Sequence, residues 1–286
     1  MNLDYLPQPL NLEKYIKYKS EIYDSTEVDV FINDKRDFAF LSPMLEVDYN
    51  NYIPRVKKLG LRKYSLVHDH LNRRYNKIKD FFYDKKNMLE IGASDGSFLK
   101  IIKENHKDII CSSCEPDQST LIQRQKYSDY DFANLEQIID KNMHFEIIVL
   151  SHVFEHIQAP IKFLNDIKKL MNENSLIIIE VPSLNDPLIS LYNNKNYESF
   201  YFNIQHPFIY SNNSLDRVLV HNQFKSVSII SHQRYGLENH LQWLSNGNPG
   251  GNPDYHAFTN NLEQGYIKNL EKINKSDSVI WVGKKC

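Results

Sequence analysis

Two apolar segments in the first half of the chain are each followed by residues suited to binding a nucleoside. The first, at residues 88–91, leads into a turn of small residues that contains Gly92 and Gly96. Glycine has no Cβ, so the backbone of such a turn can lie directly against a ligand. The second segment, at 109–111, is followed by Glu115, placed where a doubly wound sheet usually binds the ribose hydroxyls. This pattern predicts a strand–turn–helix junction at a nucleoside-binding site.

The glycine spacing indicates which cofactor fits the turn. A dinucleotide-binding turn has the spacing G-x-G-x-x-G, but serine stands at positions 94 and 97, where that motif places glycine. The run EIGASDG at residues 90–96 instead resembles motif I of class I S-adenosylmethionine-dependent methyltransferases, E/D-x-G-x-G-x-G, with Ser94 at the central glycine. S-adenosylmethionine carries no phosphate, so the resemblance implies a turn that holds an amino-acid carboxylate and a sulfonium.

Further segments follow in the order of the same family. Residues 145–150 form an apolar run that resembles the family's fourth strand, and the sequence SHVFEHI follows it at 151–157. Apolar residues then recur at helical spacing over 161–171, and another apolar run at 176–181 resembles the fifth strand. The resemblance covers about residues 85–232 and implies an α/β, Rossmann-like, seven-stranded class I methyltransferase fold.

The resemblance also implies S-adenosylmethionine as the cofactor and assigns its contacts. Glu115 would bind the ribose hydroxyls, and the backbone around Gly92 and Gly96 would hold the methionine portion. Asn134 stands about where the family contacts the adenine. The full set of expected cofactor-binding residues is Glu90, Gly92, Ala93, Ser94, Gly96, Glu115, Pro116, Asn134, Ser151 and His152.

Methyl transfer to a hydroxyl requires removal of a proton, and histidine titrates near neutral pH. Three histidines are candidate bases: His156 after the fourth strand, His206 in the segment QHPFIYS, and His240 in the segment 233–243. Each could instead make a structural hydrogen bond. The residues expected to contact the acceptor are Arg234, Tyr235, Asn239 and Tyr201.

Two patterns could indicate a metal site, and we interpret neither as one. His152, Glu155 and His156 match the H-x-x-E-H signature of zinc peptidases, which requires a regular helix, whereas this segment follows a predicted strand directly. Cys111 and Cys114 match C-x-x-C, but residues three apart on a strand point to opposite faces. We expect both cysteines to be core thiols.

The elements that position these residues divide the chain into two regions. Residues 1–86 are predicted to form an N-terminal helical cap or substrate lid, because apolar residues recur at helical spacing over 56–82. The basic residues within this pattern are interpreted as the solvated face of that helix, with contact to a substrate phosphate or to RNA as the alternatives. Residues 87–286 are predicted to form the Rossmann-like methyltransferase domain.

The end of the chain predicts how the sheet closes. A helix is expected near residues 214–222, followed by a strand at 227–231 and a last strand at 278–283. In the family these two strands form an antiparallel pair. The connection between them, about residues 232–277, is too long for a simple loop and is expected to have its own structure.

Composition agrees with an enzyme of this kind. The chain has 286 residues, a formal net charge of −2 and three cysteines. The charge gives no general attraction to nucleic acid, no apolar run reaches the ~20 residues of a membrane span, and no signal-peptide pattern precedes the first motif. These features predict a cytoplasmic enzyme that uses neither nucleic acid nor membrane, with a homodimer possible.

The expected reaction is O-methylation of a small hydroxylated acceptor, such as a sugar or sugar nucleotide in bacterial surface-glycan biosynthesis. This acceptor class comes from the family resemblance and not from residues that specify a sugar. The alternatives are N- or C-methylation of a small molecule, and a non-catalytic Rossmann subunit that serves as a scaffold.

Overall fold

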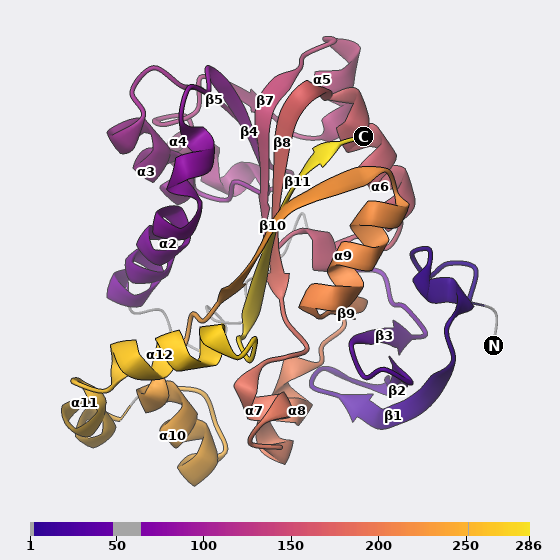
Figure 1. The fold of residues 1–286 in the computed structure, drawn as a ribbon, viewed down its shortest axis with the longest axis vertical. Helices are drawn as coiled ribbons and strands as arrows, with labels where there is room; N and C mark the ends of the chain where they lie inside the picture. Colours follow the sequence, from indigo (N-terminus) through magenta and orange to yellow (C-terminus); the bar gives the residue numbers. More distant parts are fainter. Residues whose placement is uncertain (1–2, 48–63, 251) are drawn as a thin grey trace.

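Short apolar runs separated by helical segments produce the expected parallel sheet. The computed structural model describes residues 3–47, 64–250 and 252–286 (Figure 1). Seven strands form the main sheet in the order β10-β11-β8-β7-β4-β5-β6. The neighbours from β8 to β6 pair in parallel, and β11 pairs antiparallel with both β8 and β10. The strands are β4 (Asn87–Ile91), β5 (Ile110–Cys114), β6 (Tyr130–Phe132), β7 (Phe145–Ser151), β8 (Met171–Pro182), β10 (Phe224–His232) and β11 (Ser278–Lys285).

Helices cover both faces of this sheet, as the unbroken apolar strands require. One face packs against α2 (Tyr64–Ile78) and α3 (Ser97–Asn105), and the other against α5 (Leu135–Asp140), α6 (Pro160–Lys169) and α9 (Asn212–His221). Cys111 belongs to the first core and Cys114 to the second, and both are buried free thiols. The prediction of two core thiols on opposite faces is therefore confirmed.

The N-terminal region differs from the predicted helical cap. Residues 15–42 form the antiparallel strands β1 (Tyr15–Ile22), β2 (Ser25–Asn33) and β3 (Phe38–Ser42), and β9 (Phe208–Tyr210) completes a four-stranded sheet. The prediction of helices was wrong here because it overlooked the period-two alternation that buries Val28, Val30 and Ile32 on one side of β2. Helix α2 agrees with the end of the predicted helix, while residues 56–63 lie outside the described part.

The predicted closing pair and insert are present. Strands β10 and β11 pair antiparallel over their whole length, and helix α9 precedes them. The insert between them forms three helices, α10 (Leu237–Asn246), α11 (Pro253–Thr259) and α12 (Glu263–Lys272). Every helix within residues 3–47, 64–250 and 252–286 falls short of the length and apolarity that a membrane crossing requires.

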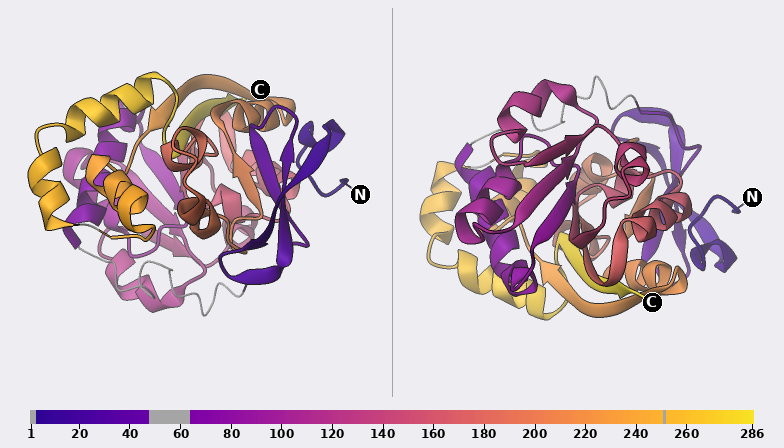
Figure 2. Two further views of the ribbon diagram at one scale, coloured as in Figure 1. Left: turned by 90° about the horizontal axis from the view of Figure 1, so that it is seen from below. Right: turned by 90° about the horizontal axis from the view of Figure 1, so that it is seen from above.

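Three sets of elements gather at the carboxyl end of the parallel strands. The small sheet lies on one side and the insert helices on the other (Figures 1 and 2). Between them lie α7 (Pro187–Ser190) and α8 (Lys195–Tyr201), which follow β8. Since ligands of open α/β sheets bind at this end, these elements surround the expected site.

The small sheet shares its core with the main sheet, which gives a test of the fold. Phe40 of β3 is fully buried, and its ring contacts Phe31 at 5.4 Å and Tyr15 at 5.0 Å between centroids. Phe40→Ala should lower the free energy of unfolding by about 3–5 kcal/mol, measured by urea denaturation. Leu12→Ala, at a side chain 82% exposed, should change it by less than about 0.5 kcal/mol. Equal effects would contradict a common core.

Candidate active site

The turn after β4 has the backbone geometry that the motif requires. Gly92 and Gly96 have φ of 75° and 77°. A Cβ on Gly92 would lie 2.3 Å from Cγ2 of Val153, and one on Gly96 would lie 3.0 Å from Cα of Arg124. Ser94, which replaces the motif's central glycine, also has a left-handed conformation with φ of 48°. The serine therefore keeps the backbone path of the motif despite its side chain.

Glu115 lies against this turn, and its expected role in ribose binding stays a prediction. Its Oε2 accepts a hydrogen bond of 2.9 Å from the backbone N–H of Ser94, and its Oε1 accepts one of 2.9 Å from Asp117. These bonds fix the carboxylate between the ends of β4 and β5. Pro116 and Asn134 are exposed beside it, and the Asn134 side chain caps α5 by accepting from Gln137 N–H at 3.1 Å.

A buried arginine, which was not expected from the sequence, bonds the backbone of the turn from the protein interior. Arg124 is fully buried, donates to the carbonyl of Ser94 at 2.7 Å, and pairs through Nε with Asp131 at 2.6 Å. A lone arginine at the end of the short segment LIQR gives no sequence signal for such a role. The network makes the path of the turn part of the folded core.

Glu90, the acidic residue of the motif, is buried at the end of β4. Burial raises the pKa of its carboxyl to about 8, and no described residue bonds its Oε2. A carboxyl that holds its proton near neutral pH can donate a hydrogen bond to a polar group of the cofactor. Ala93 is buried next to it, and the Oγ of Ser151 is also without a partner in the described part.

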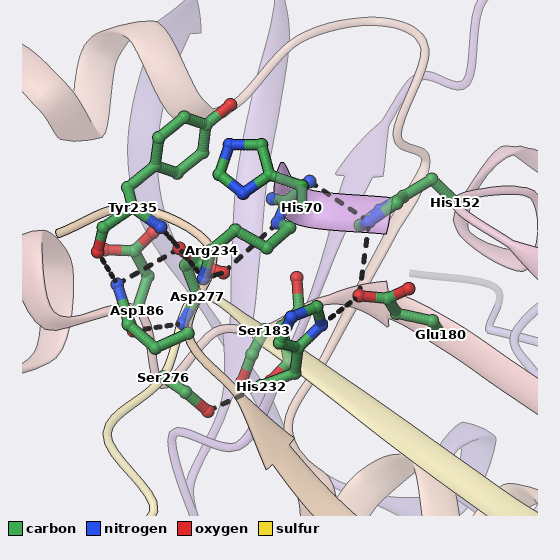
Figure 3. A network of polar contacts seen from close by, with 12 residues as sticks. His70, His152, Glu180, Ser183, Asp186, His232, Arg234, Tyr235, Ser276 and Asp277 are labelled. Carbon is green, nitrogen blue, oxygen red and sulfur yellow. Dashed lines mark hydrogen bonds and ion pairs between the residues drawn. The ribbon is translucent and has the colours of Figure 1, made fainter. Parts of the chain in front are cut away.

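Glu180 is the centre of a second polar network at the carboxyl edge of the main sheet (Figure 3). This fully buried residue of β8 pairs with Arg74 of α2, and its Oε1 accepts from His232 Nδ1 at 2.7 Å. Burial alone would raise its pKa, but Arg74, His232 and His152 hold the pKa well below its usual range. Glu180 was not among the residues expected at the site, although a single charge within the apolar run at 176–181 was a usable signal.

His152 lies at the end of β7 between this network and the turn. Its φ is 56°, and its Nε2 is 3.0 Å from Nη1 of Arg234 and 3.7 Å from Oε1 of Glu180. Arg73 donates to the carbonyl of Arg234 at 2.7 Å. Arg73 and Arg74 therefore point into the site region, whereas the sequence analysis interpreted the basic stretch as a solvated face.

The insert is attached to the sheet through Asp277. This buried carboxylate accepts from the backbone N–H groups of Arg234 and Tyr235 at 3.0 Å and 2.9 Å, and pairs with Nε of Arg234 at 3.2 Å (Figure 3). Arg234 and Tyr235, two of the residues expected to contact the acceptor, are thus held at the carboxyl edge of the main sheet. Asn239 lies half-buried on α10, while the buried Tyr201 donates its hydroxyl to Ser183.

The three candidate bases fall into two groups. His156 and His206 lie with ring centroids 4.8 Å apart beside the buried Glu155. His240 is buried under the insert, where its Nδ1 lies 2.5 Å from the hydroxyl of Tyr266. Burial lowers the pKa of His240 to about 4. The structure therefore brings His156 and His206 together and places His240 in an interior contact.

Glu155 is the centre of the first group. It lies in the short helix η4 (Phe154–His156), with its Oε1 3.4 Å from His152 and 3.9 Å from His156. Burial would raise its pKa, but His152, His156 and His206 lower the pKa to about 2, so the carboxylate is ionised. The sequence predicted that this segment would not form the regular helix of a zinc peptidase, and the structure confirms this, because the segment is one short turn.

The sequence matches a methyltransferase domain family over residues 66–229, more than half of the chain. The chain belongs to this methyltransferase family. It is therefore an enzyme of the methyltransferase class, and the S-adenosylmethionine expected from the motif is the cofactor of that class. No curated protein matches the sequence.

Solved structures of the same fold include other methyltransferases. A SAM-dependent methyltransferase from Archaeoglobus fulgidus has 19% identity and a TM-score of 0.54, with 83% of this chain and 100% of that chain covered. A possible histamine N-methyltransferase from Thermotoga maritima has 15% identity and a TM-score of 0.51, with 81% and 96% covered. The plantazolicin methyltransferase BpumL in complex with SAH has 12% identity and a TM-score of 0.50, with 79% and 86% covered.

Asp186 makes the stability of this methyltransferase depend on pH. It is buried beside Asp277, accepts from the hydroxyl of Tyr197 at 2.6 Å and caps α7. Burial, followed by the charge of Asp277, raises its pKa to about 7. A raised carboxyl pKa stabilises the fold below the unfolded pKa near 4, and this contribution is lost as pH rises through about 7.

Asp186→Asn should remove this pH dependence. Between about pH 4 and 7, the native enzyme should lose up to about 1.4 kcal/mol of unfolding free energy per pH unit relative to the variant, measured by urea denaturation. Asp108→Asn, at an exposed carboxylate, should retain the native slope. Parallel curves for the enzyme and Asp186→Asn would show that Asp186 is ionised throughout.

Proposed function

We propose that the enzyme transfers the methyl group of S-adenosylmethionine to a hydroxyl oxygen of a small acceptor. The observation that carries this proposal is the group of His156 and His206 around the ionised Glu155, after β7. Such a group can take up the proton that a hydroxyl loses as its oxygen attacks. A sugar or sugar nucleotide of bacterial surface-glycan biosynthesis is the acceptor class that we favour.

The roles of the residues follow from this reaction. The acceptor oxygen forms a bond to the methyl carbon in line with the sulfur, which leaves as a neutral thioether while the hydroxyl proton passes to the histidine group. The sulfonium already activates the methyl group, so most of the catalysis is positioning and exclusion of water. Glu115 would hold the ribose, and Arg234 and Tyr235 would contact the acceptor from the insert.

A groove next to the small sheet has side chains suited to a carbohydrate, although none of the residues that line it belongs to the glycine turn or to the histidine group. It has a volume of about 460 Å³ and lies between β1, α8 and the segment after α10. Its lining includes the rings of Tyr23, Phe200 and Trp243 and the amide side chains of Asn196 and Asn248. Aromatic rings pack against the C–H faces of sugars, and amides bond their hydroxyls. Such a groove could hold the part of a larger acceptor that does not react.

Two observations weigh against the alternatives. Residues 1–86 contain no cysteine, whereas sugar C-methyltransferases often carry a cysteine-based zinc site there. The glycine turn and Glu115 keep the geometry of a cofactor site, which a non-catalytic scaffold would not need. N-methylation remains the second candidate, because the ionised Glu155 and Glu180 would attract an amine.

Glu115→Ala tests the cofactor assignment. Loss of two contacts to the ribose should weaken S-adenosylmethionine binding by about 2–3 kcal/mol in calorimetry. The native enzyme should bind S-adenosylmethionine and S-adenosylhomocysteine and give no heat with NAD. Glu104→Ala, at an exposed residue of α3, serves as the control. Unchanged affinity in Glu115→Ala would remove this residue from the site.

His206→Asn tests the acceptor side. The variant should lose about 10²-fold or more in kcat on a hydroxyl acceptor while cofactor affinity stays unchanged. His221→Asn, at a histidine of α9 that contacts Gln8, should retain full turnover. A panel of sugar, sugar-nucleotide and amine acceptors identifies the class. Full activity in His206→Asn would shift the role to His156, and turnover of amines alone would replace O-methylation by N-methylation.

A further inference from the structure

Three groups of the kind that bind metal ions meet at the carboxyl end of β7. The Nε2 of His156 lies 3.9 Å from Oε1 of Glu155, and the rings of His156 and His206 are 4.8 Å apart. The ligand atoms that these three residues offer all lie within 4.8 Å of one another. They come from two segments about 50 positions apart in the sequence, so no short motif contains all three.

The carboxylate of Glu155 is buried without hydrogen bonds to the described residues, and this distinguishes the site from an ordinary cluster of polar residues. Its side chain is 2% exposed, and neither carboxylate oxygen has a hydrogen-bond partner in the described part of the chain. The nearest histidine nitrogen, Nδ1 of His152, is 3.4 Å away, beyond the usual range of about 2.7–3.2 Å. A buried carboxylate without hydrogen bonds is costly, and a bound cation would compensate it.

A hydrogen bond to the backbone fixes which nitrogen of His156 carries a proton. Its Nδ1 lies 2.7 Å from the carbonyl oxygen of Gln205, which can only accept a hydrogen bond, so Nδ1 carries a proton. Metal-binding histidines commonly have their second nitrogen bonded to a carbonyl in this way. If the ring is neutral, its lone pair is on Nε2, the nitrogen that faces Glu155.

We propose that Glu155, His156 and His206 bind one divalent transition-metal ion. Two imidazoles and one carboxylate suit Zn²⁺, Fe²⁺ or Co²⁺ and not the all-oxygen sites of Mg²⁺ or Ca²⁺. Ligand atoms around such an ion lie roughly 3–3.5 Å apart, given metal–ligand distances of about 2.1 Å. The ligand atoms of the three residues lie within 4.8 Å of one another, so they must move closer together when an ion binds.

Three protein ligands leave a coordination position open, as in catalytic sites. The role of the ion, though not its binding, rests on the proposed function. A hydroxyl bound at the open position would lose its proton to solvent more readily, and its oxygen would then form the O–CH₃ bond as the S–CH₃ bond breaks. The histidines would in that case act as ligands and the ion would activate the acceptor.

Cobalt titration of untagged enzyme, first stripped with a chelator, tests the site without an acceptor. Co²⁺ should bind with one equivalent and give the visible bands of a four- or five-coordinate ion, and Zn²⁺ should remove them. Glu155→Gln and His206→Asn should each weaken Co²⁺ binding by about tenfold or more. His256→Asn, which removes the exposed His256–Glu238 pair, should bind Co²⁺ as the native enzyme does.

The outcomes separate the metal site from the reaction. No visible bands in the native enzyme, or equal bands in all variants, would overturn the site even if hydroxyl acceptors are methylated. Stoichiometric Co²⁺ binding that both site variants lose would establish it, even if only amines are methylated. Calorimetry with S-adenosylmethionine shows that each variant is folded, and because His206 is half-buried, its variant tests the site independently of the buried Glu155.

Discussion

The buried carboxylate of Glu180 is the charge on which the carboxyl edge of the sheet depends. It holds Arg74 of α2 and His232 of β10, and His152 of the β7 end lies within 3.7 Å. Removing one partner of a buried ion pair typically costs about 3–5 kcal/mol, because the remaining charge stays without compensation. Three elements far apart in the sequence are therefore fixed at one point. That point lies beside the turn where the cofactor is expected.

A second buried network sets the shape of the turn itself. Arg124 bonds the carbonyl of Ser94 from inside, and Glu115 bonds its N–H from outside. Both polar groups of the peptide backbone at Ser94 are thus satisfied by side chains, and the residue is held with φ of 48°. This explains how a serine can replace the central glycine of the motif. The conformation is imposed by Arg124 of α4 (Leu121–Arg124) and by Glu115, which follows β5, and not by the residue's own preference.

The main sheet and its closing pair could be predicted because each depends on local signals, namely apolar runs, glycine spacing and their order. Strands β1–β3 were missed because the alternation that buries Val28, Val30 and Ile32 was overlooked, and β9, which completes their sheet, joins from about 170 positions away in the sequence. The site divides in the same way. Glu115 and Gly92 follow from a motif, whereas Arg124, Arg74 and His232 act through contacts between distant segments. No spacing rule could have indicated these contacts.

The segment that follows β8 connects the histidine group proposed for the acceptor side to the strand that carries Glu180. Ser183 forms a parallel β-bridge with Tyr210 of β9. The carbonyl of Ser183 accepts a hydrogen bond of 2.9 Å from the hydroxyl of Tyr201. The segment that carries His206 is therefore anchored at both ends to Ser183, which directly follows the strand that carries Glu180. Histidines placed on a free loop would sample many positions, while methyl transfer requires the attacking atom to lie in line with the sulfonium. The small sheet, expected from the sequence to be a helical lid, is thus joined to the sheet edge through a common buried cluster, and in the proposed reaction the acceptor would be positioned through that connection.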